Sequence, residues 1–310
     1  MDKRYNTFSA HLKRIFGCKV QRISIDAGFS CPNRDGTLGS KGCIFCGGRG
    51  SGSFGIKPEL PIALQLEDGK ALMRRKYHAD KFIAYFQPYT NTYADLSVLR
   101  QRYEEALSVP DVVGLIIATR PDCLDDSKYD YLSELDITTY FWLEIGMQSM
   151  HDKSLEFINR QHDFRATQHA IKAAVDRGIK VCAHVILGLP GETRTDMLET
   201  AEMLNLMRVN GVKIHLLHVM KNTGLETHYR ERGLVLMDRD EYVGTVCDFL
   251  ERLNPEIIIH RLTGDGGHDN LVAPLWSLKK FEVLNLIDKE LTSRGTAQGA
   301  RCGAVEPRIL

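Results

Sequence analysis

Short apolar segments alternate with helical segments along this 310-residue chain, and this alternation constrains its fold more than any other feature. Apolar runs rich in β-branched residues predict strands. We expect strands at 20–26, 81–86, 112–118, 138–146, 180–188 and 212–219, with a candidate seventh at 256–262. Segments between them have the apolar rhythm of a helix, and one of them, 163–178, ends on a glycine as helices often do.

Strands that alternate with helices are typical of parallel sheets joined by right-handed crossovers. Six such units fit a partial or complete barrel better than a small open sheet. We therefore predict an α/β fold, a partial TIM-type (β/α)6 barrel that spans 20–260. A basic N-terminal segment, 1–19, precedes it, and a C-terminal extension, 261–310, follows as a short helical cap that we expect to cover the barrel mouth.

Composition excludes several other classes of protein. The chain is 43% hydrophobic and 26% charged, as globular domains are, and no apolar run approaches the length of a membrane span. The N-terminus lacks the apolar core of a signal peptide, so we expect a cytoplasmic protein with no membrane partner and with reduced thiols. The formal net charge is zero. The basic residues near the N-terminus form either a surface for phosphates or simply a solvated face.

Three of the eight cysteines gather in a glycine-rich loop, Ser30–Gly50, after the first predicted strand. Two residues separate Cys43 from Cys46, and eleven separate Cys31 from Cys43. Structural zinc usually has four ligands in two close pairs, and a redox Cys-x-x-Cys pair would leave Cys31 without a role. Three thiolates fit a [4Fe–4S] cube with one iron open to a substrate or cofactor, and zinc remains the alternative.

Polar and glycine residues follow the predicted strands, where α/β barrels place their chemistry. Each of six strands delivers such residues to the same face of the barrel. They are Cys31, then Gln87, Tyr89, Thr90 and Asn91, then Thr119, Arg120 and Asp122, then Glu144, Gln148 and Ser149, then Gly188, Pro190 and Gly191, and finally Lys221, Asn222 and Thr223. This convergence predicts an active site.

The cysteine motif ends in Cys-x-aromatic-Cys, with Phe45 at the aromatic position, and resembles that of the radical S-adenosylmethionine (SAM) superfamily. The long first gap departs from the three residues usual there and resembles the YhcC/YtqA-type subfamily and, more distantly, the Elp3-like proteins. The segments "RPDCL", "GMQS", "LGLPGET" and "RLTGD" are similar as well, so the resemblance covers about residues 10–295. It implies a [4Fe–4S] cluster on Cys31, Cys43 and Cys46 that cleaves SAM to a 5′-deoxyadenosyl radical, which abstracts a substrate hydrogen.

The resemblance also implies residues that bind SAM. The segment around Gln87 stands in place of the family's Gly-Gly-Glu motif and departs from it, Glu144 matches the ribose position, and Arg160 is a candidate for the methionine carboxylate. Each of these residues has an ordinary structural role as its alternative. The full predicted set is Phe45, Gln87, Glu144, Gln148, Ser149, Arg160, Gly188, Pro190, Gly191 and Val219.

The Elp3-like and YtqA-type resemblance further implies a tRNA substrate, with a wobble uridine side chain converted from carboxymethylaminomethyl to aminomethyl. It also implies an electron donor such as flavodoxin or ferredoxin. Candidate substrate contacts are Arg120, Asp122, Lys221, Arg261 and Asp265, although the last two are equally typical of a capping and packing cluster. The alternatives are a radical SAM enzyme for a small metabolite and a non-catalytic Fe–S or zinc protein that binds RNA or a protein partner.

Overall fold

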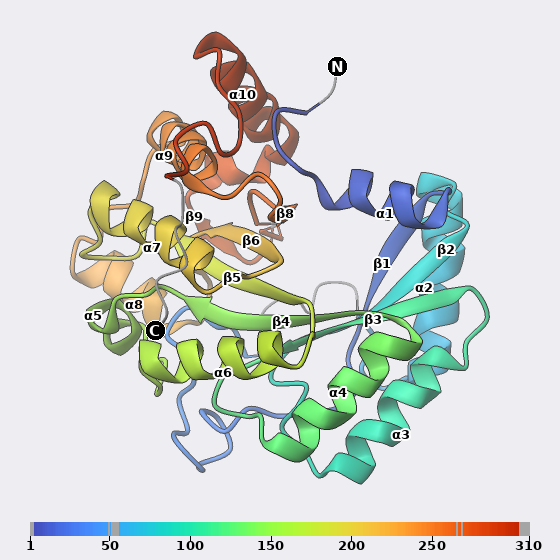
Figure 1. Ribbon diagram of the computed structural model, residues 1–310. Helices are drawn as coiled ribbons and strands as arrows, with labels where there is room; N and C mark the ends of the chain where they lie inside the picture. Colours follow the sequence, from blue (N-terminus) through green and yellow to red (C-terminus); the bar gives the residue numbers. More distant parts are fainter. Residues whose placement is uncertain (1–2, 49, 51–55, 265, 268, 304–310) are drawn as a thin grey trace.

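A curled sheet of parallel strands forms the frame of the computed structural model (Figure 1). The structure describes residues 3–48, 50, 56–264, 266–267 and 269–303. Within these ranges the main sheet has seven strands, in the order β1-β2-β3-β4-β5-β6-β8. They are β1 Val20–Ile25, β2 Lys81–Phe86, β3 Val112–Thr119, β4 Tyr140–Gln148, β5 Val181–Leu187, β6 Gly211–Leu216 and β8 Ile258–Arg261. Neighbours along the chain are neighbours in the sheet, which is the arrangement of a partial TIM barrel.

The strand pattern of the sequence is confirmed, and the candidate seventh strand is present as β8, which pairs with β6. Two boundaries were wrong. Thr138 is the last residue of helix α4 rather than the first of a strand. The predicted strand 212–219 divides, because after β6 the chain leaves the main sheet and forms β7, Val219–Met220, which pairs with β9, Leu271–Ala273.

Helices connect the strands and cover the convex face of the sheet (Figure 1). Thr193 and Asp196 form a capping box that begins α7, and Gly178, with φ of 78°, follows α6 as the sequence predicts. None of the helices in the described ranges is long and apolar enough to cross a membrane. The helices after β1 are α2 Ile62–Tyr77, α3 Leu96–Leu107, α4 Asp126–Thr138, α5 Asp152–Phe157, α6 Phe164–Asp176, α7 Arg194–Leu206, α8 Gly224–Glu231, α9 Arg239–Arg252, the 3-10 turn η1 Leu275–Leu278 and α10 Lys280–Ser293.

Helix α1, Phe8–Phe16, packs at the end of the barrel where the strands begin. Its buried residues Phe8 and Leu12 share one apolar cluster with Val20 at the start of β1 and Trp142 of β4. The backbone before the helix also pairs with β8 through Thr7. The segment predicted as a basic arm, 1–19, therefore contains a helix that closes the barrel floor.

The C-terminal extension, predicted at 261–310, lies in two places. Its first part forms β9 beside β7, near the carboxyl end of β6. Helix α10 packs on α9, close to the N-terminal segment (Figure 1). It holds that segment, because Lys3 pairs with Asp288 and Arg4 Nε donates to Thr292 Oγ1 at 3.2 Å. That the extension covers the mouth stays a prediction.

Candidate active site

Hydrogen bonds from polar side chains hold the cysteine loop after β1. Arg34 donates to the carbonyl of Cys46 at 2.9 Å. The side chain of Asn33 donates to the carbonyl of Asn159 at 2.7 Å, and the side chain of Asn159 donates to the carbonyl of Gly42 at 2.7 Å. The loop is rich in glycine, and these bonds define its shape together with Ile44 and Phe45, which pack against the core.

All three cysteines of the loop line one cavity. Arg160 Nη1 lies 3.5 Å from the sulfur of Cys43, and Asn33 Nδ2 lies 3.7 Å from it, so both side chains donate toward this sulfur. The three sulfurs do not all lie within 4.8 Å of one another. One tetrahedral zinc ion, with Zn–S bonds of about 2.3 Å, would hold its sulfurs about 3.8 Å apart. A [4Fe–4S] cube does not require its sulfurs to lie so close together, because each thiolate binds a different iron.

The cavity has a volume of about 1510 Å³ and continues from the cysteine loop into the barrel. Binding sites for single small ligands are commonly about 300–1,000 Å³, so this one has room for a cofactor and part of a substrate. Among its described lining residues, nine are lysine or arginine and one, Glu144, is an acid. The interior is therefore strongly cationic although the whole chain has a formal net charge of zero.

Half of the predicted SAM-binding residues line this cavity in the described structure, and half do not. Those that line it are Phe45, Gln87, Glu144, Gln148 and Arg160. The others are Ser149, Gly188, Pro190, Gly191 and Val219. Ser149 donates to the carboxylate of Glu192 at 2.5 Å, and Gly188 packs against Met237. The cofactor contacts of all ten residues stay predictions.

Arg160 joins the cysteine loop to the carboxyl end of β4. Besides its contact with Cys43, its Nη2 donates to the carbonyl of Gly146 at 2.9 Å. A Cβ atom on Gly146 would lie 2.6 Å from Arg160 Nη2 and 2.8 Å from Gln148 Nε2. Gln148 itself has φ of 71°, a left-handed conformation that is found often at functional sites. The absence of a side chain at Gly146 thus sets the positions of both polar groups.

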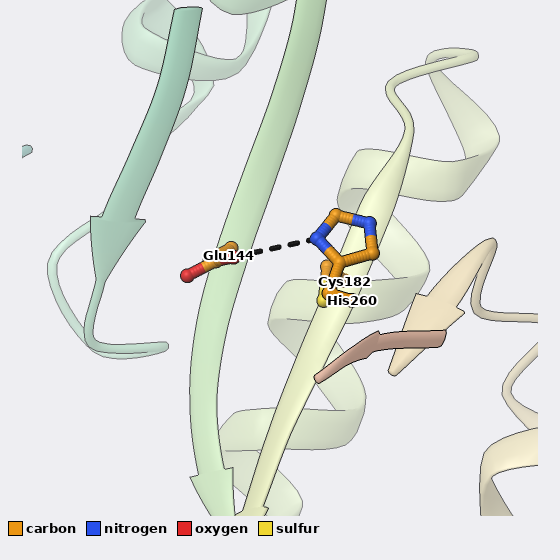
Figure 2. A group of neighbouring side chains, drawn as sticks. All are labelled: Glu144, Cys182 and His260. Carbon is orange, nitrogen blue, oxygen red and sulfur yellow. Dashed lines mark ion pairs between the residues drawn. The ribbon is translucent and has the colours of Figure 1, made fainter. Parts of the chain in front are cut away.

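Glu144 lies inside the barrel, four residues before the end of β4. Tyr85 Oη donates to its Oε2 at 2.5 Å, and Lys213 Nζ donates to the same oxygen at 2.9 Å. His260 Nδ1 lies 3.5 Å from the other oxygen, as Figure 2 shows. Burial alone would raise the pKa of Glu144, but the charge of Lys213 and the hydrogen bond and charge of His260 hold that pKa well below its ordinary value.

Glu144, Cys182 and His260 have ligand atoms within 4.8 Å of one another, the spacing of a metal site (Figure 2). Burial, and then the charge of Glu144, raises the pKa of Cys182 well above its ordinary value, so this thiol is protonated and a poor ligand. Lys213 already neutralises Glu144 at 2.9 Å. These side chains form a polar layer inside the barrel, and their chemistry does not suit a metal.

The predicted substrate contacts are only partly brought together. Arg120 donates through Nε and Nη2 to both oxygens of Asp122, at 2.9 and 2.7 Å, and through Nη1 to the carbonyl of Arg160 at 2.9 Å. Burial opposes ionisation of Asp122, but bonding to Arg120 holds its pKa below the ordinary value. Arg120, Lys221 and Arg261 line the cavity. Asp265 lies outside the described residues.

Several cavity residues carry polar groups that sequence reasoning missed. They lie on inward-facing positions of four strands and are Arg22, Tyr85, His184, Lys213 and His215. The sequence contains one relevant signal, because Lys213 and His215 alternate with apolar residues along β6 and therefore face the same side. Taken one at a time, the histidines offer no such indication.

Comparison with known proteins agrees with this geometry. A model described as "Radical SAM superfamily" matches residues 35–204, and one for the "Radical_SAM C-terminal domain" matches residues 209–293. YtqA of Bacillus subtilis (strain 168) is 46% identical over 96% of this chain and 92% of its own length. YhcC of Escherichia coli (strain K12) is 38% identical over 98% of this chain and 97% of its own length.

Among solved structures, the archaeal Methanocaldococcus infernus Elp3 with its N-terminus deleted has the same fold. Its TM-score is 0.70, at 17% identity, over 91% of this chain and 64% of that chain. The family match, the two full-length relatives and the curled parallel sheet with its cysteine loop agree. This chain therefore belongs to the radical SAM superfamily of enzymes.

Proposed function

We propose that this enzyme remodels the side chain of a tRNA wobble uridine, from carboxymethylaminomethyl to aminomethyl. The observation that carries the proposal is the cationic cavity that runs from the cysteine loop into the barrel. Enzymes that modify a base in RNA draw that base out of its stack into a pocket. A side-chain carboxylate on the base would complement the excess of positive charge. The Elp3-type similarity supports the same substrate class.

In this proposal Cys31, Cys43 and Cys46 would hold a [4Fe–4S] cluster, which with SAM would supply a radical that abstracts a hydrogen from the carbon between the side-chain amine and the carboxylate. Loss of one electron from that carbon, with SAM as the net oxidant, would give an iminium, and water would then hydrolyse its carbon–nitrogen bond, so that the carboxymethyl group leaves as glyoxylate and the aminomethyl group stays on the base. The residues of the chain position the reactants. Arg160 donates toward the sulfur of Cys43, and Arg120 fixes the backbone of Arg160 through its carbonyl. The barrel wall would shield the radical from bulk water.

We also propose that flavodoxin or ferredoxin supplies the electron and that the enzyme acts in the cytoplasm, where thiols stay reduced. Lys221 is exposed and lines the cavity, and we propose it as a contact for RNA phosphates. Arg120 and Arg261 remain proposed substrate contacts, with Asp122 acting through Arg120.

The test is an anaerobic assay with reconstituted enzyme, a reductant, SAM and tRNA that carries carboxymethylaminomethyluridine. We expect 5′-deoxyadenosine and aminomethyluridine to form together, as measured by liquid chromatography and mass spectrometry. Cys43→Ala should form neither product. Cys302→Ala, which removes a thiol that does not line the cavity in the described structure, should behave as the wild type does.

The products of this assay test the proposed substrate and the proposed radical chemistry separately. Formation of 5′-deoxyadenosine with unchanged tRNA would contradict the proposed substrate and favour a small metabolite with an anionic group. Intact SAM in the presence of an assembled cluster would contradict the catalytic role of the loop itself.

A further inference from the structure

A layer of polar side chains crosses the barrel interior below the cysteine loop. Arg22 of β1, Tyr85 of β2, Glu144 of β4 and Lys213 of β6 all line the cavity. Glu144 lies four residues before the end of β4, which at about 3.3 Å per residue is about 13 Å along the strand. The layer therefore lies well inside the cavity, away from the end of β4.

Glu144 neutralises only part of the positive charge in this layer. Its Oε2 accepts hydrogen bonds from Tyr85 and Lys213, and Lys213 also contacts the oxygen of Tyr85. An ammonium group has three donors, and these two contacts leave the third for a ligand. Arg22 adds a second cation, whose Nη1 is buried with no hydrogen-bond partner among the described residues.

The surroundings of Lys213 report the same excess of positive charge. Burial is the largest cause that lowers the pKa of Lys213, to about 8, and the charges of Arg261 and Arg22 lower it further against the pull of Glu144. Burial would act in the same way in a neutral interior, and only the contributions of Arg261 and Arg22 are repulsion between cations. An anion placed beside Lys213 and Arg22 would relieve that repulsion.

Two histidines complete the wall on the side of β5 and β6. The rings of His184 and His215 lie 4.6 Å apart, centroid to centroid, and both line the cavity. Burial, followed by nearby cations, holds both pKa values well below the ordinary value, so both rings are neutral near neutral pH. His184 Nε2 is buried without a hydrogen-bond partner among the described residues. A neutral imidazole can donate one hydrogen bond to an anion.

We propose that Lys213 and Arg22, with His184 beside them, form a subsite that binds a carboxylate of the substrate inside the barrel. Glu144 and Tyr85 position Lys213. The subsite deepens the proposed function and rests on it. The phosphates of an RNA backbone stay outside when a base enters a pocket, so an anion that reaches this depth belongs to the base or to a small molecule. The carboxymethyl group of the proposed nucleoside is such an anion.

The test compares the affinities of two anticodon stem-loop RNAs, one with carboxymethylaminomethyluridine and one with aminomethyluridine, for the reconstituted enzyme with SAM. We expect wild type to bind the carboxylate-bearing RNA about 10- to 100-fold more tightly, the range for hydrogen bonds to charged groups. Lys213→Met and Arg22→Met should each reduce this ratio, while their affinity for the aminomethyl RNA stays the same. Fluorescence anisotropy measures both affinities.

Lys213→Met leaves Glu144 buried without its cation and can fail to fold. The double variant Lys213→Met/Glu144→Gln removes both charges together and, with Arg22→Met, keeps the test decisive. If wild type binds both RNAs tightly and with equal affinity, the proposed subsite is overturned and the tRNA proposal stays intact.

If wild type binds neither RNA, the tRNA proposal fails, and the subsite is tested with N-methylglycine and methylamine as probes. Carboxylate-dependent binding that Lys213→Met/Glu144→Gln abolishes would then support the subsite. Equal binding of the two probes, or no binding of either, would overturn it.

Discussion

At the scale of single residues, the placement of polar groups in the site depends on Gly146, which has no side chain. Gly146 lies between Arg160 and Gln148, and any Cβ there would come within 3 Å of both polar groups. Those atoms are the ends of flexible side chains, so they would move and the strand would persist. The hydrogen bond from Arg160 to the Gly146 carbonyl and the contact with Cys43 depend on the present placement.

We therefore predict that Gly146→Ala folds but loses at least about 10-fold in SAM cleavage, because misplaced groups in an active site cost rate more than stability. The measurement is the initial rate of 5′-deoxyadenosine formation at equal cluster content. Gly244→Ala is the matched control, since its new Cβ would meet only ordinary contacts at 3.6 Å or more. A rate for Gly146→Ala equal to that of the control would show that this spacing is unimportant.

The stability of the folded protein should depend on pH through Lys213, and the pKa of Lys213 determines the direction of this dependence. Burial, with Arg261 and Arg22, lowers its pKa from the ordinary 10.5 to about 8 in the folded state. Between these values the unfolded chain binds more protons than the folded chain, so stability rises with pH by at most about 1.4 kcal/mol per unit. Below pH 8 the cost of the buried charge is fully present.

Urea denaturation of wild type and of Lys213→Met/Glu144→Gln at several pH values measures this effect. We expect the difference in free energy of unfolding to move in favour of wild type as pH rises from 8 toward 10.5. A difference that stays constant across that range would mean that Lys213 titrates with an ordinary pKa in the folded protein.

At the scale of elements, helix α1 closes the barrel floor beneath the polar layer. Phe8 packs 4.1 Å from His260 and 6.0 Å from Trp142, measured between ring centroids. His260 in turn faces Glu144. The helix therefore supports the polar layer as well as the apolar cluster at the start of the strands.

Phe8→Ala should destabilise the protein by about 3–5 kcal/mol, since it leaves a cavity under a closed end of the barrel. Ile15→Ala, on the same helix but 49% exposed against 5% for Phe8, should cost no more than about 0.5 kcal/mol. Chemical denaturation of both variants measures these free energies. Similar losses for the two would contradict the packing of α1 as a floor.

The sequence predicted strands and the cysteine loop well because both are local patterns. The alternation of strands and helices predicts the order of the sheet, and the spacing of Cys31, Cys43 and Cys46 predicts the loop. Glu144 was among the predicted residues, but the polar layer as a whole could not be predicted, because its members come from strands as distant as β1 and β8 and only the fold brings them together. The division of the strand at 212–219 depends equally on a distant partner, β9.

At the scale of the whole molecule, positive and negative charges balance in number but are unevenly distributed. The formal net charge is zero, yet the cavity is cationic. At the N-terminus, Lys3 and Arg4 are engaged by α10, whereas Lys13 and Arg14 of α1 are exposed. Ser9 and Leu12 of the same helix line the cavity. Lys13 and Arg14 lie on the floor helix, away from the mouth, so we infer that they meet the phosphates of an RNA that extends along the outside of the barrel while its base enters at the mouth.

Each phosphate contact changes the slope of log affinity against log salt by about 0.7 to 0.9. We therefore predict that Lys13→Ala/Arg14→Ala reduces the magnitude of that slope for tRNA by about 1 to 2, with the preference for the carboxylate-bearing RNA unchanged, because positioning contacts and base contacts are separate. Anisotropy titrations over a range of potassium chloride concentrations measure both. Arg165→Ala/Lys172→Ala removes two exposed cations of α6 as the control and should leave the slope as in wild type. Equal slopes for all three proteins would place the RNA on another face, and a lost preference in the α1 variant would tie α1 to the interior subsite instead.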